Sequence, residues 1–258
     1  MMKKTIFFNS LGFLILASFL LSGCQTVTLH ALGSHPLPVM HEPKTDKSDR
    51  EEKIISANLH GAILDSTPNT YDILGGGASL NFTYRAGGAL SWLFASATLS
   101  GSYGKLKLNC DDEDCNLLYK AITERKDSYS FASIQEGARV GVEFTPGFFT
   151  TGLSGGIHLY QDLGEFETFR DSLKQANLIE GNASNGFFPE ARAWVGVRLG
   201  PSGNYGTINL ESVFQFLADD IESALMFNLG YFHPTGWHAG VLTGGSAFSL
   251  TAGKSFSF

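Results

Sequence analysis

Three titratable residues in the second half of the chain have the types that acid–base chemistry needs. They are His158, Glu190 and Glu222. A histidine beside a carboxylate can act as a general base, with the carboxylate orienting the imidazole. Such a group would suit hydrolysis, with either a serine or an activated water as the attacking group. No motif marks a nucleophile, so the sequence defines no catalytic residue, and a structural role for these candidates is the competing interpretation.

Further charged residues occur where apolar and polar side chains alternate along the chain. Arginine and glutamate are nearly balanced among them, and charges that are buried need partners of opposite sign. We therefore expect a salt-bridged network that fills a narrow interior, formed by Arg139, Glu143, Arg192, Arg198 and Glu211.

The segments that carry these residues have the period-two alternation of β-strands with one apolar face. In Ile73–Tyr84, for example, Leu80 and Phe82 alternate with Asn81 and Thr83. Residues 149–160, 189–199, 207–217, 221–232 and the C-terminal segment show the same pattern. It is weaker in residues 54–64, 89–108 and 237–244, and in 89–108 the aromatic residues Trp92 and Phe94 fall out of phase with Leu93, Ala97 and Leu99.

Very short links alternate with longer ones between these segments. The short links are residues 85–88, 145–147, 201–204 and 233–236, and the longest are 109–127 and 164–187. A transmembrane β-barrel needs tight turns on one side of the membrane and tolerates long loops on the other. The fold class predicted is therefore all-β, an antiparallel transmembrane β-barrel of about ten strands, with eight or twelve as the alternatives.

The polar faces of the strands carry small residues and charges of both signs, as a crowded polar lumen would. Aromatic residues lie near strand ends on the apolar faces, and the chain stops at Phe258 with Phe256 two residues before it. This terminal pattern resembles bacterial outer-membrane barrels, which implies a barrel with its apolar face outward. Glu136 and Lys254 fall on that apolar face, so each would need a bulge, a rim position or another register.

The first residues have the pattern of a secretory signal. Lys3 and Lys4 precede the apolar run Ile6–Leu21, and Leu21-Ser22-Gly23-Cys24 follows it. These four residues resemble the lipobox of bacterial lipoproteins, which implies acylation of Cys24, including palmitate. An ordinary signal cleaved nearby is the alternative. We expect a signal peptide in 1–23, a lipidated flexible tether in 24–52 and the barrel in 53–258.

Cys110 and Cys115 are the remaining cysteines and enclose four acidic residues. Because an exported chain meets an oxidising compartment, a disulfide that closes this small loop is expected. The acidic run does not match the ligand spacing of an EF-hand, and two thiolates are too few for structural zinc. We predict no metal and no cofactor.

The formal net charge of −7 argues against a nucleic-acid partner, which would require a basic face. We expect a monomer in the bacterial outer membrane, with its lipid anchor on the periplasmic side and a surface structural or interaction role, or a very narrow channel. Residues 109–127 and 164–187 are the candidate contacts for an extracellular partner. Within them, residues 116–126 and 166–177 have helix-like spacing of apolar side chains, which predicts short helices over the mouth of the barrel. The alternatives are a barrel hydrolase acting on lipid A or peptides, although no motif of omptin proteases or lipid A deacylases is present, and a soluble periplasmic lipoprotein resembling lipocalins.

Overall fold

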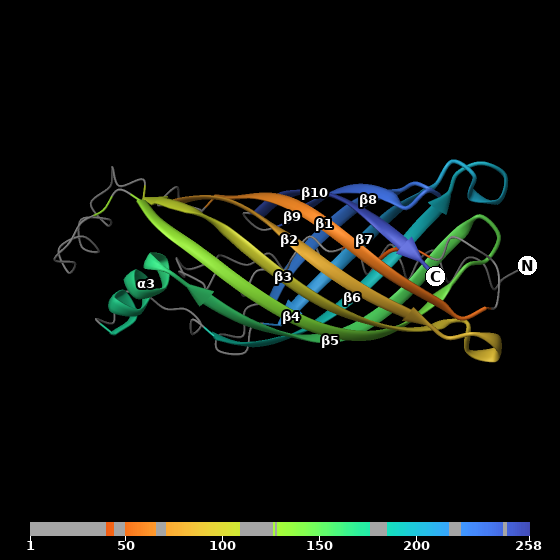
Figure 1. The fold of residues 1–258 in the computed structure, drawn as a ribbon, viewed down its shortest axis with the longest axis horizontal. Coiled ribbons are helices and arrows are strands. Elements are labelled where there is room, and N and C mark those ends of the chain that lie inside the picture. The colour runs from red at the N-terminus through yellow and green to blue at the C-terminus, as the bar shows by residue number, and fades with distance from the viewer. Residues whose placement is uncertain are drawn as a thin grey trace, which may run out of the picture.

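The computed structural model describes residues 40–43, 50–65, 71–108, 126, 128–175, 185–216, 223–244 and 247–258. They form a closed antiparallel barrel of ten strands (Figure 1). The strands are β1 (Glu52–Asp65), β2 (Tyr71–Arg85), β3 (Leu93–Leu108), β4 (Ser128–Phe144), β5 (Phe149–Leu163), β6 (Asn185–Arg198), β7 (Thr207–Phe216), β8 (Ser223–Phe232), β9 (Trp237–Gly244) and β10 (Ala247–Ser257).

Each strand pairs with its neighbours in the sequence, and β1 closes the barrel by pairing with β10. The closure continues past the strands, since Lys53 and Phe258 exchange backbone hydrogen bonds of 3.4 and 3.0 Å. Following paired residues once around the barrel leads from Leu93 to Lys105 on the same strand, a stagger of twelve residues. The strands are therefore tilted and the interior is only modestly wider than that of eight-stranded barrels.

The barrel is apolar outside and polar inside. Leu153 on the outer face is 61% exposed, whereas Arg192 and Glu211 inside are 3% and 1% exposed. Leu80, which the sequence placed toward lipid, is also exposed. This orientation is confirmed, and it excludes a soluble barrel of the lipocalin kind, which would bury its apolar side chains. Within the described ranges, no helix is long and apolar enough to cross a membrane.

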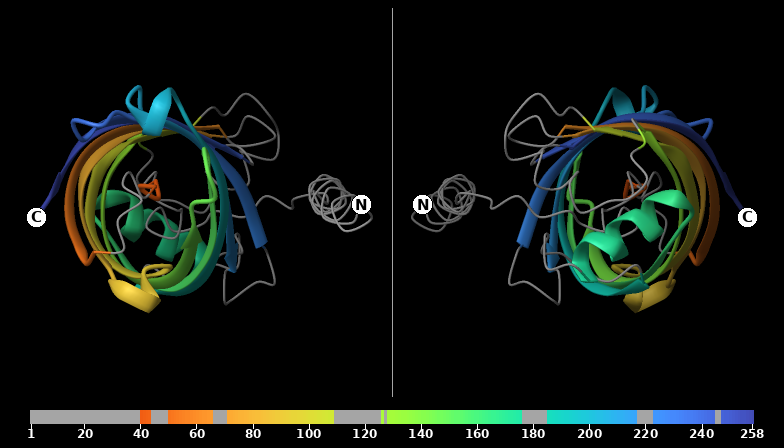
Figure 2. Two further views of the ribbon diagram at one scale, coloured as in Figure 1. Left: turned by 90° about the vertical axis from the view of Figure 1, so that its right-hand side faces the viewer. Right: turned by 90° about the vertical axis from the view of Figure 1, so that its left-hand side faces the viewer.

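The two ends of the barrel differ. Four short links join β2 to β3, β4 to β5, β6 to β7 and β8 to β9 at one end, which we call the short-turn end. Two of them contain the short helices η2 (Gly88–Leu90) and η3 (Pro201–Gly203), and tight turns use glycines with positive φ such as Gly147 and Gly236. The helix α3 (Glu165–Gln175) lies at the opposite, long-loop end (Figures 1 and 2).

The three segments with weak alternation are strands, as predicted, although β3 begins at Leu93 because η2 occupies Gly88–Leu90. The helix-like spacing after Gly164 corresponds to α3. Cys24, Cys110, Cys115 and most of 109–127 lie outside the described residues, so the lipidation and the disulfide stay predictions.

The two residues that break the outer alternation have different explanations. Lys254 is half-buried near the short-turn end, and its Nζ lies 4.8 Å from the centre of the Trp237 ring. This is the rim position that the sequence allowed for. Glu136 pairs in regular register with Leu99 on β3 and Leu159 on β5, so no bulge redirects it. Its side chain is exposed on the lipid-facing surface.

Candidate functional site in the lumen

The centre of the lumen contains an ion-pair group carried by β6, β7 and β8. Arg192 donates to both oxygens of Glu190, at 2.6 and 2.9 Å, and to Glu211 at 3.4 Å. Asn228 donates to Glu211 at 3.3 Å. All four side chains are buried, and we call them the central network. The sequence placed Arg192 and Glu211 in one network without assigning partners, and Glu190 is the closer partner of Arg192.

His158 joins this group from β5. Its Nε2 lies 3.1 Å from Glu190 Oε1, and its ring stacks on Phe188 with centres 5.0 Å apart. Two of the three candidate catalytic residues, His158 and Glu190, are thus neighbours, while Glu222 lies outside the described residues. Because Arg192 binds both oxygens of Glu190, that carboxylate is committed to an ion pair. The arrangement resembles packing of charge in a narrow interior more than a general base.

The other predicted lumen residues are buried but distributed along the barrel. Arg139 on β4 donates to Ser96 Oγ on β3 at 2.9 Å. Arg198 lies at the end of β6, and Glu143 lies one residue from the end of β4. Glu143 pairs with Arg85, a residue that the sequence did not include in the network.

A second polar cluster occupies the lumen at the short-turn end. Arg85, the last residue of β2, donates to Glu52 at 2.9 Å and to Glu143 at 3.4 Å. Thr150 on β5 donates to the other oxygen of Glu143 at 2.9 Å. The sequence did not predict Arg85, because the pattern assigned it to a turn.

Residues Met40–Pro43, which we call the plug segment, lie inside this end of the barrel (Figure 2). The sequence predicted a flexible tether here, and the described part of it contacts the lumen wall instead. The His41 side chain is 2% exposed, and its Nε2 lies 3.0 Å from Glu143 Oε2. Arg85 also donates to the carbonyl of Glu42, and Ser56 donates to the Glu42 carboxylate.

Two aromatic residues of the barrel wall face inward and surround His41. Its ring stacks on Trp194 with centres 3.9 Å apart, and the Phe94 ring centre is 4.7 Å away. Glycines on the facing strands make room for these rings: a Cβ on Gly141 would lie 2.6 Å from Phe94, and one on Gly152 would lie 2.2 Å from Trp194. The out-of-phase position of Phe94 was the available sequence signal for an inward aromatic.

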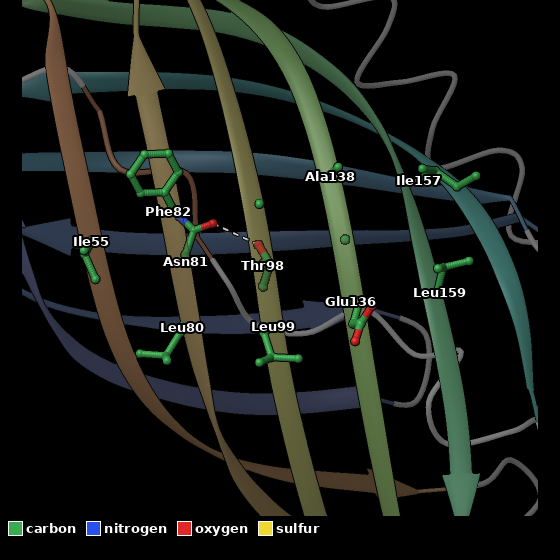
Figure 3. A pocket seen from close by; sticks show the side chains of 12 residues that line it. Ile55, Leu80, Asn81, Phe82, Thr98, Leu99, Glu136, Ala138, Ile157 and Leu159 are labelled. Atoms are coloured by element: carbon green, nitrogen blue, oxygen red, sulfur yellow. Dashed lines mark hydrogen bonds between the residues drawn. The ribbon is translucent and has the colours of Figure 1, made fainter.

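The outer face carries a shallow hollow that spans β1 to β5 (Figure 3), and the small residues Ala97 and Ala138 are part of its lining. Leu80, Leu99 and Leu159 border it, and Glu136 lies between the last two. A lipid-facing carboxylate is unfavourable in a bilayer. Apart from Glu136, the exposed side chains around the hollow are apolar, as expected for a surface that contacts lipid acyl chains.

The helix α3 packs over the long-loop end of β4 and β5. Its own residues Phe166 and Phe169 are buried, and the Phe169 ring stacks on Tyr129 with centres 4.1 Å apart. Arg170 is buried 3.9 Å from Asp162. These contacts fix α3 across part of the opening (Figure 2).

The start of α3 is attached by polar contacts at the surface. Lys126 donates to Glu165 at 2.7 Å, and the Ser130 backbone and hydroxyl donate to the same carboxylate at 3.2 and 3.0 Å. The hydrogen bond from Lys126 and those from Ser130 lower the pKa of Glu165 to about 2. In the part of the chain that the structure describes, no group of three or more His, Cys, Asp or Glu is placed to hold a metal ion.

The fold and its apolar exterior define a ten-stranded β-barrel of the outer-membrane type. No family model matches the sequence, and no curated protein matches it. Among solved structures, an outer membrane channel from Pseudomonas putida F1 covers 81% of this chain and 96% of its own, at 10% identity and a TM-score of 0.44.

Two autotransporter domains are similar in the same way. The β domain of the Bordetella autotransporter Brka covers 81% of this chain and 100% of its own, at 11% identity and a TM-score of 0.45. The translocator domain of NalP from Neisseria meningitidis covers 82% and 89%, at 9% identity and a TM-score of 0.40. At these values the likeness carries no conclusion about function.

Proposed function

We propose that this chain is a structural lipoprotein of the bacterial outer membrane, with a closed lumen and a surface-exposed long-loop end that serves interaction. The single observation that carries the proposal is the occupancy of the lumen. The central network fills its middle, the plug segment fills the short-turn end, and α3 lies over the other end. Such a barrel is a scaffold for its loops rather than an open pore.

The topology supports a periplasmic short-turn end. An even number of strands puts both ends of the barrel domain at the same side, where Lys53 and Phe258 are paired. In bacterial barrels the tight turns face the periplasm. A lipid on Cys24 in the inner leaflet of the outer membrane would lie on that side, which agrees with this orientation.

Conductance tests the closed lumen. We expect the refolded full chain to insert into planar bilayers without single-channel steps, because fixed ion pairs occupy the middle of the lumen and the plug segment occupies one end. Incorporation is verified separately by the heat-dependent gel mobility of folded barrels. Stepwise conductance from the inserted, folded chain would show that the lumen is a narrow channel, and the scaffold proposal would be abandoned.

Labelling of intact cells tests the exposed end. In a chain with Cys110 and Cys115 replaced by serine, Gln175→Cys should react with a membrane-impermeant maleimide. Ala89→Cys in η2 is the matched control, since both positions are exposed side chains at barrel ends. Reaction of Ala89→Cys alone would reverse the orientation.

A hydrolase is the second candidate, because His158 and Glu190 are adjacent. It requires an activity against lipid A or a peptide that His158→Ala abolishes while the barrel remains folded. An unchanged activity in that variant would remove His158 from any mechanism.

A further inference from the structure

Residues of the barrel wall contact both the side chains and the backbone of the plug segment. We propose that the short-turn end of the lumen is a peptide-binding site built around His41, occupied in the resting chain by residues Met40–Pro43. The occupant is thus a segment of the same polypeptide. The site goes beyond the scaffold role, because it makes the closed state depend on a bound peptide that can be exchanged.

The imidazole of His41 is recognised on two sides. The indole of Trp194 stacks on one face at 3.9 Å, and Phe94 packs at a tilt of 43°. Glu143 lies 3.0 Å from Nε2 and accepts a hydrogen bond when that nitrogen carries a proton. Arg85 and Thr150 also donate to Glu143, so the acceptor is held by contacts that do not involve the imidazole.

The backbone of the plug segment is recognised as well. The His41 N–H donates to Glu211 Oε2 at 3.4 Å, and Asn209 donates to the His41 carbonyl at 3.4 Å. Arg85 donates to the Glu42 carbonyl. Hydrogen bonds to the peptide backbone do not depend on the side chains of the bound peptide. The pocket around the imidazole adds selectivity for histidine at position 41.

The wall is also shaped for the residue before His41. Met40 is 7% exposed and lies against Gly230 on β8 and Gly240 on β9. A Cβ on Gly230 would lie 2.5 Å from the Met40 sulfur, and one on Gly240 would lie 2.1 Å from it. Glycine at both positions therefore creates the space that the thioether occupies. A nonspecific contact between a flexible linker and the barrel wall would not require glycine at these positions.

The first experiment measures protection in the full chain, with Cys24, Cys110 and Cys115 replaced by serine. Met40→Cys should react with a soluble maleimide at least about tenfold more slowly than Glu51→Cys, whose native side chain is exposed. Adding His41→Ala should remove most of that protection. The control is His233→Ala, an exposed histidine in the link between β8 and β9, which should leave it unchanged. Equal reaction at positions 40 and 51 would overturn the proposal without any need for the His41 variant.

The second experiment supplies the peptide in trans. A synthetic peptide of residues 36–46 added to the folded His41→Ala chain should displace the altered segment and change the fluorescence of Trp194 saturably. Trp194→Phe identifies the reporting indole, since Trp92 and Trp237 remain. The same peptide with alanine at position 41 should bind at least about tenfold more weakly. No saturable change, or equal binding of the two peptides, would refute a histidine-selective site and leave the closed scaffold untouched.

Discussion

At the scale of single residues, Arg192 bridges the two glutamates of the central network. Its guanidinium serves Glu190 and Glu211 at once, whereas Glu211 also accepts from Asn228 and the His41 backbone. Removing the arginine leaves two buried carboxylates close together. Removing Glu211 still leaves Arg192 paired to Glu190. The two deletions therefore have unequal costs.

Arg192→Leu should lower the free energy of unfolding by about 3–5 kcal/mol, since it strands buried charge. Glu211→Leu should lower it less, by about 1–3 kcal/mol, because the variant loses the hydrogen bonds that the Glu211 carboxylate accepts while Arg192 keeps its ion pair with Glu190. Urea unfolding in lipid vesicles measures both, with Glu211→Gln as the isosteric comparison. A larger loss for Glu211→Leu than for Arg192→Leu would contradict the assignment of Arg192 as the shared partner.

Glu136 presents the opposite situation, a carboxylate exposed toward lipid among leucines. Glu136→Leu should raise the free energy of unfolding by about 1 kcal/mol in bilayers, since acidic residues on a lipid-facing surface are unfavourable, though less so than arginine or lysine. Glu136→Gln should give a smaller gain. Destabilisation by Glu136→Leu would mean that the carboxylate has a favourable partner in the membrane.

The residue scale also shows where sequence reasoning stops. Alternation assigned Arg192, Glu211 and Leu80 to the correct faces, because a membrane barrel sorts side chains by polarity. It gave no reason for Trp194, an aromatic side chain on the same face as Arg192, because the contact that explains it comes from the plug segment. His41 was beyond reach, because no periodic pattern links the plug segment to β4 and β6.

At the scale of elements, the strands were predictable and their connections were partly so. The weakly patterned strands β1, β3 and β9 could be predicted from the strand count, because a barrel with both chain ends on one side of the membrane has an even number of strands. The length of β3 was overestimated because Gly88 and its neighbours form a 3-10 turn, which the alternation does not distinguish from the end of a strand. Spacing of Phe166 and Phe169 predicted α3, but only the structure shows the Tyr129 and Asp162 contacts that fix it.

The attachment of α3 depends on pH in a defined direction. The pKa of Glu165 is lowered to about 2 in the folded chain, so its contacts with Lys126 and Ser130 stabilise the docked helix above the ordinary carboxyl pKa. That contribution is lost as pH falls through the range from about 4.5 to about 2. Hydrogen-exchange protection factors of α3, corrected for intrinsic rates, should decrease over this range.

Glu165→Gln is the test variant for this element, and Glu167→Gln on the same turn is its control. The first should remove most of the pH dependence in α3, and the second should retain it. Equal pH dependence in wild type and Glu165→Gln would assign the effect to other carboxylates, such as Asp162 or Asp171.

At the scale of the whole molecule, one arrangement explains the rest. Outward apolar side chains require a bilayer, and inward charges require each other, so the barrel is stable only with that polarity. The stagger of twelve residues over ten strands leaves an interior that side chains and the plug segment fill. In the proposed function, closure of the lumen follows from its size and charge, and interaction is assigned to the ends of the barrel.

Spin-label scanning of β2 tests this polarity most directly. Single cysteines at residues 74 to 84, in a chain without other cysteines, report contact with lipid through collisions with oxygen. We predict that oxygen accessibility alternates with a period of two, with maxima at Leu74, Leu80 and Phe82 and minima at Ser79, Asn81 and Thr83. Maxima at Ser79, Asn81 and Thr83 would mean that the polar face meets the lipid, and the account of this barrel would be wrong.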